Sequence, residues 1–281
     1  AARTYRAWRR RSASARDTSD AVLLNVLHDL VGTPEGLYGR RKMTAWLRRE
    51  GHQVGAGRVD RLMRVAGMNG VRRGRPVRTT VPAKDGCRAG DLLNRDFTAA
   101  APNTKWVADF TYVRTWAGFV YVAFVLDCYS QRILAWHAAT AKTTPLVLTP
   151  LRIALWDRDR HGHPVQPGEL IAHSDAGSQY TSLRFAEHLA AEGIAASIGT
   201  VADAYDNALM ECVIGLYKTE CITTTIFHNG PYKTIADVEY ATAGWVEWYN
   251  NRRLHSSLAM TTPAEYETAY YAALNRELAP T

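Results

Sequence analysis

The sequence predicts an α/β fold, in which a mixed five-stranded sheet flanked by helices follows a basic helical region. Three observations predict it. Strand-like runs rich in β-branched and aromatic residues gather in the middle of the chain. Helix-period apolar patterns lie before and after those runs. The chain has 281 residues, of which 47% are hydrophobic, so it can bury the core that such a fold requires.

The net charge of +7 is unevenly distributed along the chain. Residues 1–96 carry 21 Lys and Arg against 9 Asp and Glu, whereas residues 97–281 carry 13 against 18. A basic arm joined to a mildly acidic body favours nucleic-acid binding, and a surface for acidic proteins or membranes is the alternative. No apolar run reaches 18 residues, so we expect no membrane-spanning helix.

The cysteines and histidines indicate neither a disulfide framework nor a zinc finger. No two cysteines form a CxxC pair, and His161 and His163 form an HxH without a matching Cys pair. The basic N-terminus lacks the apolar centre of a secretion signal. We therefore expect a reducing, cytoplasmic setting. The four cysteines are Cys87, Cys128, Cys212 and Cys221.

Residues 1–73 are predicted to form a helical, basic, DNA-binding region. Residues 21–30 form a short apolar run, and the patterns over 39–50 and 58–68 place apolar residues on one helix face. The last two patterns are basic and are separated by GHQVGAG. Two basic helices around a glycine-containing break indicate a helix-turn-helix-like DNA reader. A small helical bundle with solvated arginines is the alternative.

Residues 74–103 are predicted to be a linker, because the stretch from 71 to 95 is rich in Arg, Pro and Gly and has no period. Its arginines could follow DNA phosphates, and a solvated tether is the alternative. The arginines that we assign to DNA binding are Arg72, Arg73 and Arg75.

Residues 104–225 are predicted to form the catalytic core. Three strand-like runs with short turns between them indicate an antiparallel meander. Helices and strands then alternate, and the order βββαβαβα is that of a ribonuclease-H-like domain. Residues 226–281 are expected to form a C-terminal helical extension of this core. The strands are expected at 105–113, 119–127, 132–138, 169–175 and about 195–199, and the helices at 144–157, 181–193 and 206–221.

Three acidic residues are candidates for a metal site. Asp109 lies within an apolar strand, where burying its charge is costly unless a cation compensates. Asp175 ends a short strand and precedes small residues that let a ligand approach. Glu211 lies early in a helix. Taken singly, they could be a satisfied buried Asp, a helix N-cap and a solvated acid. Carboxylates that converge from separate elements are what a pair of divalent ions requires for phosphodiester transfer.

Helical spacing separates the neighbours of Glu211. Gly215 is four residues further on and Lys218 seven, so both share its face. Glu220 is nine residues further on and should face elsewhere. The face of Glu211 therefore carries a small residue that clears space and a cation that can meet a phosphate.

These motifs resemble the successive signatures of the insertion-sequence-three family of bacterial transposases, relatives of the retroviral integrases with a DDE catalytic core. The resemblance covers residues 104–266, and 35 residues separate Asp175 from Glu211, which is similar to the DD(35)E spacing of that family. The motifs are WVADFTYV, LDCYSQRILAW, HSDAGSQYTS, DNALMECVIGLYKTE and YNNRRLHSSLAMTTPAEY.

The resemblance implies a DDE polynucleotidyl transferase that cuts and joins DNA strands at the ends of an insertion sequence. Asp109, Asp175 and Glu211 would be its catalytic residues and the ligands of two Mg²⁺ or Mn²⁺ ions, and Lys218 would contact the element's terminal DNA. The implied partners are transposon ends, target DNA, at least one further copy of the chain, and an upstream-frame fusion partner. The implied setting is the bacterial nucleoid. A catalytically idle DNA-binding repressor or architectural protein on the same fold is the alternative.

The chain also departs from this pattern. Family members usually place Ser and aromatic residues after the catalytic Glu, where this chain has Cys212, Val213 and Ile214. These side chains are not expected to be ligands, so the chemistry should survive. The HHCC zinc module of retroviral integrases is missing from this sequence.

Residues next to the three acids have predicted supporting roles. His173 and Ser174 would orient Asp175, or would pair structurally. Asp206 and Asn207 are expected to cap the catalytic helix, and Asn207 is also expected to support the acidic cluster.

Six further positions are assigned more generally. Asp127 is expected in a turn rather than as a ligand, and Gln179 and Tyr180 could contact DNA at the mouth of the site. Arg252 and His255 are assigned to DNA binding. With Arg253 they form a basic spot, for which intramolecular pairing is the equal alternative.

Overall fold

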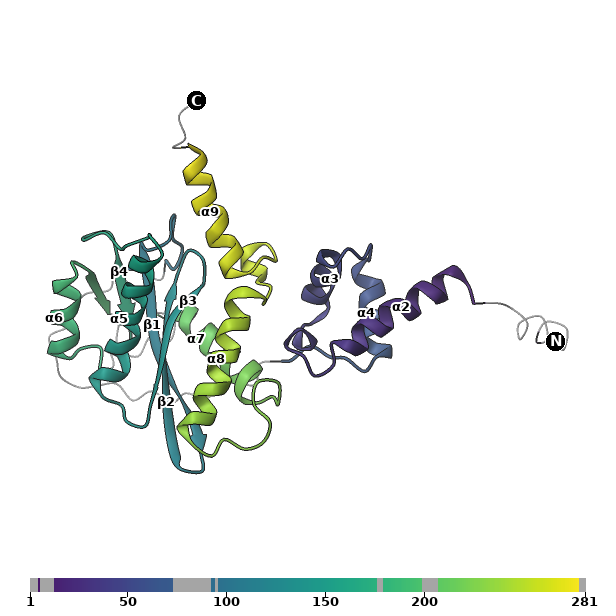
Figure 1. The fold of residues 1–281 in the computed structure, drawn as a ribbon, viewed down its shortest axis with the longest axis horizontal. Helices are drawn as coiled ribbons and strands as arrows, with labels where there is room; N and C mark the ends of the chain where they lie inside the picture. Colours follow the sequence, from purple (N-terminus) through teal and green to yellow (C-terminus); the bar gives the residue numbers. More distant parts are fainter. Residues whose placement is uncertain are drawn as a thin grey trace. The chain divides into compact units, whose positions relative to one another are not determined.

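The computed structural model describes residues 5, 13–72, 92–93, 96–175, 179–198 and 207–277. The chain divides into two compact units, residues 1–71 and 72–281 (Figure 1). Arg73, Arg75 and Asp206 lie outside the described residues.

The first unit is helical, as the sequence predicts. Its first helix begins earlier than expected, because Ser14 forms a capping box with Asp17. Its core consists of apolar side chains from all three α-helices, including Leu27, Met43 and Leu62. The elements are α2 (Ala15–Asp29), the 3₁₀ turn η1 (Pro34–Leu37), α3 (Arg40–Arg49) and α4 (Ala56–Val65).

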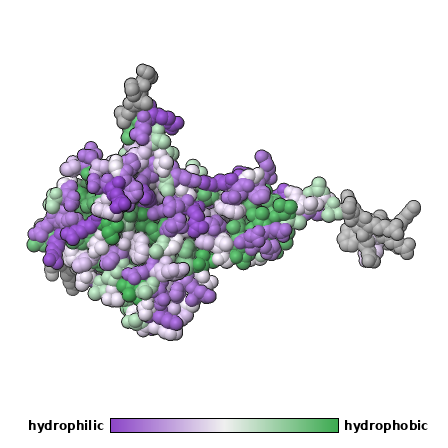
Figure 2. Space-filling view, in the orientation of Figure 1, coloured by the Kyte–Doolittle hydropathy of each residue, from purple (hydrophilic) through white to green (hydrophobic). Residues whose placement is uncertain are grey.

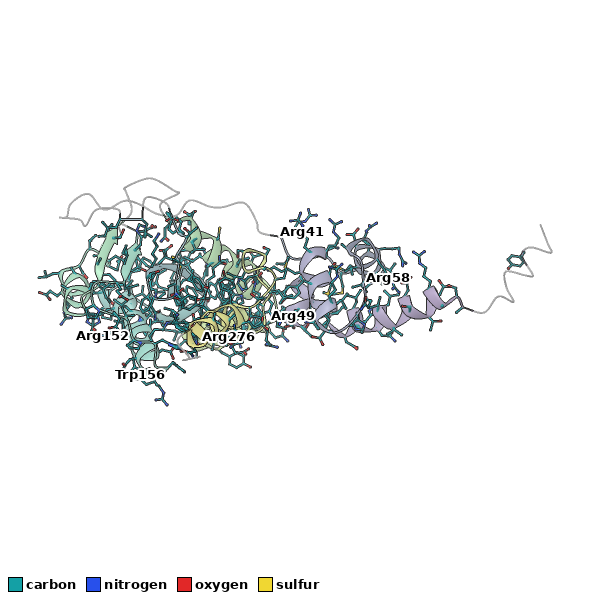
Figure 3. All side chains as sticks on the ribbon, turned by 90° about the horizontal axis from the view of Figure 1, so that it is seen from above. Arg41, Arg49, Arg58, Arg152, Trp156 and Arg276 are labelled. Atoms are coloured by element: carbon teal, nitrogen blue, oxygen red, sulfur yellow. The ribbon has the colours of Figure 1, made fainter. Side chains whose placement is uncertain are left out.

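Arginines in this unit have two different roles. The buried Asp20 accepts hydrogen bonds from Arg58 Nε at 2.7 Å and Arg61 Nη2 at 2.5 Å, which ties α4 to α2. Arg41 and Arg49 on α3 are exposed instead and point away from the helix (Figure 3).

The second unit is built on a five-stranded mixed sheet with the strand order β3-β2-β1-β4-β5. β1, β2 and β3 form the predicted antiparallel meander, whereas β4 pairs parallel to β1 and β5 parallel to β4. The strands are β1 (Lys105–Thr115), β2 (Gly118–Asp127), β3 (Ile133–Ala139), β4 (Ile171–Ser174) and β5 (Ala195–Ile198).

The two faces of the sheet bury different helices, because side chains alternate along a strand. Ala123 and Val125 face a core that α5 (Thr144–Arg160) and α6 (Leu183–Ala191) close. On the other face, the Phe124 ring packs 5.1 Å from the Tyr217 ring and 6.2 Å from the Trp245 ring. Those residues belong to the π-helical segment η2 (Tyr217–Ile222), which continues α7 (Ala208–Leu216), and to α8 (Ile235–Asn251).

β1 extends beyond its parallel neighbour. β4 pairs only with residues 105–108 of β1, whereas β2 pairs with β1 as far as Thr115. The β1–β2 hairpin therefore projects past the ends of β4 and β5, as Figure 1 shows. Asp109 is the first residue of β1 beyond β4.

The last helix, α9 (Pro263–Glu277), is held by a buried ion network. Arg158 on α5 makes two hydrogen bonds to Glu267, of which Nη2 to Oε2 is 2.9 Å long, and also lies 3.6 Å from Asp127. Asp127 accepts hydrogen bonds from the backbone amides of Asn103, Tyr129 and Ser130. Asp127 thus has the turn role that the sequence predicts.

Two segments differ from the sequence prediction. Residues 96–103, assigned to the linker, contact the core: the Phe97 ring lies 6.2 Å from the His173 ring in an edge-on geometry. The helix expected over 206–221 has α-helical form only as far as Leu216 and continues as a π-helix. Periodicity does not predict an apolar contact from an irregular segment or a local change of helix type. Among the described residues, no helix is both long and apolar enough to cross a bilayer.

We expect Glu267→Gln to lower the free energy of unfolding by about 3–5 kcal/mol, because it leaves the Arg158 charge buried without its partner. Burial alone would raise the pKa of Glu267, but Arg158 and Arg132 lower it overall. The stabilisation should therefore be lost as the pH falls through the lowered pKa of Glu267. Urea titration measures both effects. The exposed Glu239→Gln on α8 is the control, and equal stability of the two variants would contradict the prediction.

Candidate active site

Strand register brings Asp109 and Asp175 together. Ala108 of β1 is paired with Ser174 of β4, and Asp109 and Asp175 each come one residue later. Both side chains are half-buried. These two residues, 66 positions apart in the sequence, therefore lie side by side where β4 ends.

The third acid arrives on a helix. Glu211 lies in the first turn of α7 and is exposed, and α7 packs against β1. The buried Asn207, at the start of this helix, donates a hydrogen bond from Nδ2 to the Ala108 carbonyl at 3.3 Å. Asn207 stands at the N-cap position. The sequence predicts that its side chain caps the helix, but it makes no capping hydrogen bond. It fixes the helix to the strand beside Asp109 instead.

Asp175 and Glu211 both lie close enough to Asp109 to affect its pKa. The pKa of Asp109 is raised well above its ordinary value, first by burial, then by the charge of Asp175 and also by that of Glu211. The Phe110 amide, which donates to Asp109 Oδ1 at 2.7 Å, and the Lys218 charge lower it in part. The site therefore holds more negative charge than its own residues neutralise.

Lys218 belongs to the same site. It lies in η2 and is half-buried, and burial lowers its pKa whereas the charge of Asp109 raises it. Its ammonium group stands 4.9 Å from the centre of the Tyr112 ring on β1. Lys218 thus reaches from the helix to the part of β1 that extends beyond β4.

Glu220 faces away from this site, as helical spacing predicts. It is buried, and its carboxylate accepts hydrogen bonds from Arg253 Nε at 2.9 Å and Arg253 Nη2 at 2.6 Å. Trp245 Nε1 donates a further, longer hydrogen bond of 3.4 Å. This ion pair joins the end of the catalytic helix to the segment that follows α8.

The basic spot after α8 is mostly internal. Arg253 is buried in its ion pair, and His255 is buried with Nε2 3.2 Å from the Tyr249 carbonyl. The assignment of His255 to DNA binding is therefore corrected, because a buried imidazole packed against a tyrosine ring does not reach a DNA backbone. Arg252 is exposed and lies 3.3 Å from Glu247.

The residues near Asp175 contact other parts of the protein. His173 is buried, with Nδ1 2.8 Å from Ser197 Oγ on β5, which is the structural pairing. Ser174 is buried as well. Gln179 donates a hydrogen bond to the Lys142 carbonyl at 3.2 Å.

Tyr180 lies behind the acids rather than at the mouth of the site. It is 3% exposed, its hydroxyl has no hydrogen-bond partner among the described residues, and burial together with Asp109 and Asp175 raises its pKa. No sequence signal predicted this position, because residues 179–182 belong to neither a helix nor a strand and have no period.

Family models match both units of the chain. An integrase core domain model matches residues 99–204 and a second one residues 192–263, while an HTH-like domain model matches residues 22–76. Among solved structures, an integrase chain in the simian T-cell lymphotropic virus intasome with PP2A regulatory subunit B56 gamma has a TM-score of 0.50 and 14% identity. That match covers 82% of this chain and 70% of the other, and it shows the fold alone.

Together, the mixed sheet, the acidic site and the matched domains define the class of DDE polynucleotidyl transferases, the integrase-like enzymes that act on DNA. Integrase core domains as a family depend on metal ions.

Two relatives identify the family more closely. A Mycobacterium tuberculosis protein, named for transposition of the insertion sequence element IS986/IS6110, is 45% identical over 96% of this chain and 95% of its own length. The transposase for insertion sequence element IS629 of Shigella sonnei is 44% identical over 94% of this chain and 85% of its own length. The chain belongs to the insertion-sequence-three family of bacterial transposases. The predicted fold class and family are confirmed.

We expect Arg253→Met to lower the free energy of unfolding by about 3–5 kcal/mol, because it leaves the Glu220 carboxylate buried and unpaired. The neighbouring Arg252→Met is the matched control. Its ion pair is exposed, so we expect a loss of at most about 1 kcal/mol. Chemical denaturation of the two variants measures the difference, and similar losses would contradict the buried pair.

In metal-free protein we expect Asp109→Asn to raise the free energy of unfolding at pH 7. Folding raises the pKa of the Asp109 carboxyl. At pH values above the ordinary pKa of an aspartate, such a carboxyl destabilises the folded state, and the amide of Asn removes the charge responsible. The gain in free energy of unfolding should shrink as the pH falls toward the ordinary pKa of an aspartate. Urea titrations at several pH values test this, with the exposed Glu187→Gln as control. A gain that does not depend on pH would refute the electrostatic origin.

Proposed function

We propose that this transposase cuts DNA at the ends of its insertion sequence and joins the freed 3′ ends to target DNA, with Asp109, Asp175 and Glu211 as the catalytic carboxylates. One observation carries the proposal: the charges of Asp175 and Glu211 both raise the pKa of Asp109. Three acids held within electrostatic reach of one another are costly to a fold unless a cation uses them.

The residues fit a hard divalent cation, either Mg²⁺ or Mn²⁺, and we propose two ions in each site. Carboxylate oxygens are the ligands that such ions prefer. Within the described ranges, no three His, Cys, Asp or Glu side chains yet stand close enough to enclose a metal. Binding therefore needs a further approach of Glu211, which is exposed.

Each group has a separate task. Bound divalent ions would supply the Lewis acidity that neutralises charge on the phosphate and activates the attacking oxygen. Asp109 and Asp175 provide a fixed pair of ligands at the sheet, and Glu211 provides a movable one. Lys218 would hold the phosphate backbone next to the scissile bond. Asn207 keeps the helix of Glu211 against the strand of Asp109.

DNA recognition would be shared along the chain. We propose that the helix-turn-helix-like unit, together with Arg72, reads the element ends, and that Arg252 contacts the DNA backbone near the core. Arg72 and Arg252 are exposed. Joining two ends needs two active sites, so we propose at least a dimer on DNA. An upstream-frame fusion partner would add further contacts. DNA as the substrate implies action at the nucleoid.

We expect Asp109→Asn, Asp175→Asn and Glu211→Gln each to reduce cutting and joining by about 10³-fold or more, because each removes a ligand that stabilises transition-state charge. Labelled element-end DNA incubated with Mg²⁺ reports nicked and joined products on a denaturing gel. End binding should persist, since the helix-turn-helix-like unit is unchanged. Glu187→Gln is the control acid. Normal cutting by Asp109→Asn or Glu211→Gln would refute the assignment.

Metal binding has a readout that needs no DNA. Saturating Mn²⁺ should raise the Tm of the wild type, because a ligand at about 100 times its Kd stabilises by about 2.7 kcal/mol. Asp109→Asn should lose this shift, whereas Glu187→Gln should keep it. A NaCl sample of equal ionic strength separates binding from screening. An equal shift in the wild type and in Asp109→Asn would show that the ion binds elsewhere.

A further inference from the structure

The projecting β1–β2 hairpin has an unusual composition. Between Phe110 and Leu126 the only charged residue is Arg114, while six residues are aromatic. A sheet edge with so little charge invites aggregation unless something binds there. The aromatic residues are Phe110, Tyr112, Trp116, Phe119, Tyr121 and Phe124.

Register divides these aromatics between the two faces of the sheet. Tyr112 is paired with Tyr121, and Arg114 with Phe119, so all four side chains share one face. Phe110 lies on the same face at the inner end of the hairpin, where its ring is 6.2 Å from that of Tyr180. We call Tyr112, Phe119 and Tyr121 the aromatic strip.

The strip is exposed toward the end of the hairpin. Tyr121 is half-buried, whereas Tyr112 is 38% and Phe119 50% exposed. The rings of Tyr112 and Phe119 meet edge to face with centroids 5.3 Å apart, so each holds the other in place. Figure 2 shows apolar and hydrophilic residues intermixed on one face of the molecule. A continuous row of aromatic rings is therefore a distinct surface feature.

Cations stand over the rings of this strip. Lys218 Nζ lies 4.9 Å from the Tyr112 centroid, and Lys142 Nζ lies 5.7 Å from the Tyr121 centroid. The exposed Arg114 extends the row beside Phe119. Aromatic rings alternate with positive charges, which is the pattern of a surface that stacks bases and neutralises phosphates.

The strip is linked to the acidic site through Lys218. Tyr112 and Asp109 are three residues apart on β1, so their side chains leave opposite faces of the strand, but Lys218 interacts with both residues. An active site that acts on one strand of a DNA end must leave the complementary strand elsewhere. We propose that the aromatic strip binds unpaired bases of a single DNA strand next to the catalytic carboxylates. This proposal rests on the proposed function for its biological setting, but not for its test.

Base stacking can be separated from phosphate attraction by the choice of probe. A fluorescein-labelled oligo-dT strand carries both bases and phosphates, and an abasic strand of equal length carries phosphates alone. We expect full-length wild type to bind oligo-dT about tenfold more tightly than the abasic strand, which corresponds to about 1.4 kcal/mol. Fluorescence anisotropy in metal-free buffer measures both affinities, so the result does not depend on catalysis.

Tyr112→Ala combined with Phe119→Ala should abolish this tenfold preference while leaving abasic-strand binding unchanged. Tyr112→Trp should keep it, because an aromatic face remains. Trp156→Ala is the matched control: Trp156 on α5 is 58% exposed, projects outward (Figure 3) and has Arg160 5.2 Å from its ring centroid. Far-ultraviolet circular dichroism identifies any variant that fails to fold. If the double variant fails, the single variant Phe119→Ala carries the test, because it should weaken the preference for oligo-dT.

Three outcomes would overturn the proposal. They are a wild type that binds the two strands equally, a double variant that keeps the preference, and a Trp156→Ala variant that loses it. A change in oligomeric state in the double variant, with its strand preference intact, would show instead that a second copy of the chain covers the strip. Failure of the carboxylate variants to lose cutting would refute the proposed function and leave this measurement unaffected.

Discussion

Repulsion among the carboxylates of Asp109, Asp175 and Glu211 is the constraint on which the catalytic unit depends. Left alone, these charges would push the end of β4 and the start of α7 away from β1. Burial raises the pKa of Asp109 most, and the charges of Asp175 and Glu211 raise it further. The surrounding structure must therefore hold the acids from behind, by strand pairing at Ala108 and by the Asn207 hydrogen bond.

This support holds Asp109 and Asp175 more firmly than Glu211, a difference that suits the proposed chemistry. Asp109 and Asp175 follow a register fixed by backbone hydrogen bonds, whereas Glu211 is exposed on a short helix. Behind the helix, the Glu220–Arg253 pair and the ring of Tyr217 fix its far end. A site with two fixed ligands and one adjustable ligand can admit an ion without moving the sheet.

The sequence predicted the mixed five-stranded sheet and the antiparallel meander at its start, because alternation is a local signal. It did not predict the burial of His255, the position of Tyr180 or the π-helical segment. Each of these depends on packing between segments far apart in the chain, for which no periodic pattern exists. The hydrogen bond of Asn207 was missed for a related reason: an Asn before a helix normally caps it, and only the nearby Ala108 carbonyl offers another partner.

The buried guanidinium of Arg158 has a consequence for the way the chain is made. Its partner Glu267 lies 109 residues later, in the last helix. During translation, α5 leaves the ribosome long before that helix exists. Until the C-terminal end emerges, Arg158 has Asp127 as an acidic neighbour but lacks its two hydrogen bonds to Glu267. A prematurely terminated polypeptide would keep this buried cation only partly satisfied, so we expect it to be less stable than the full-length chain.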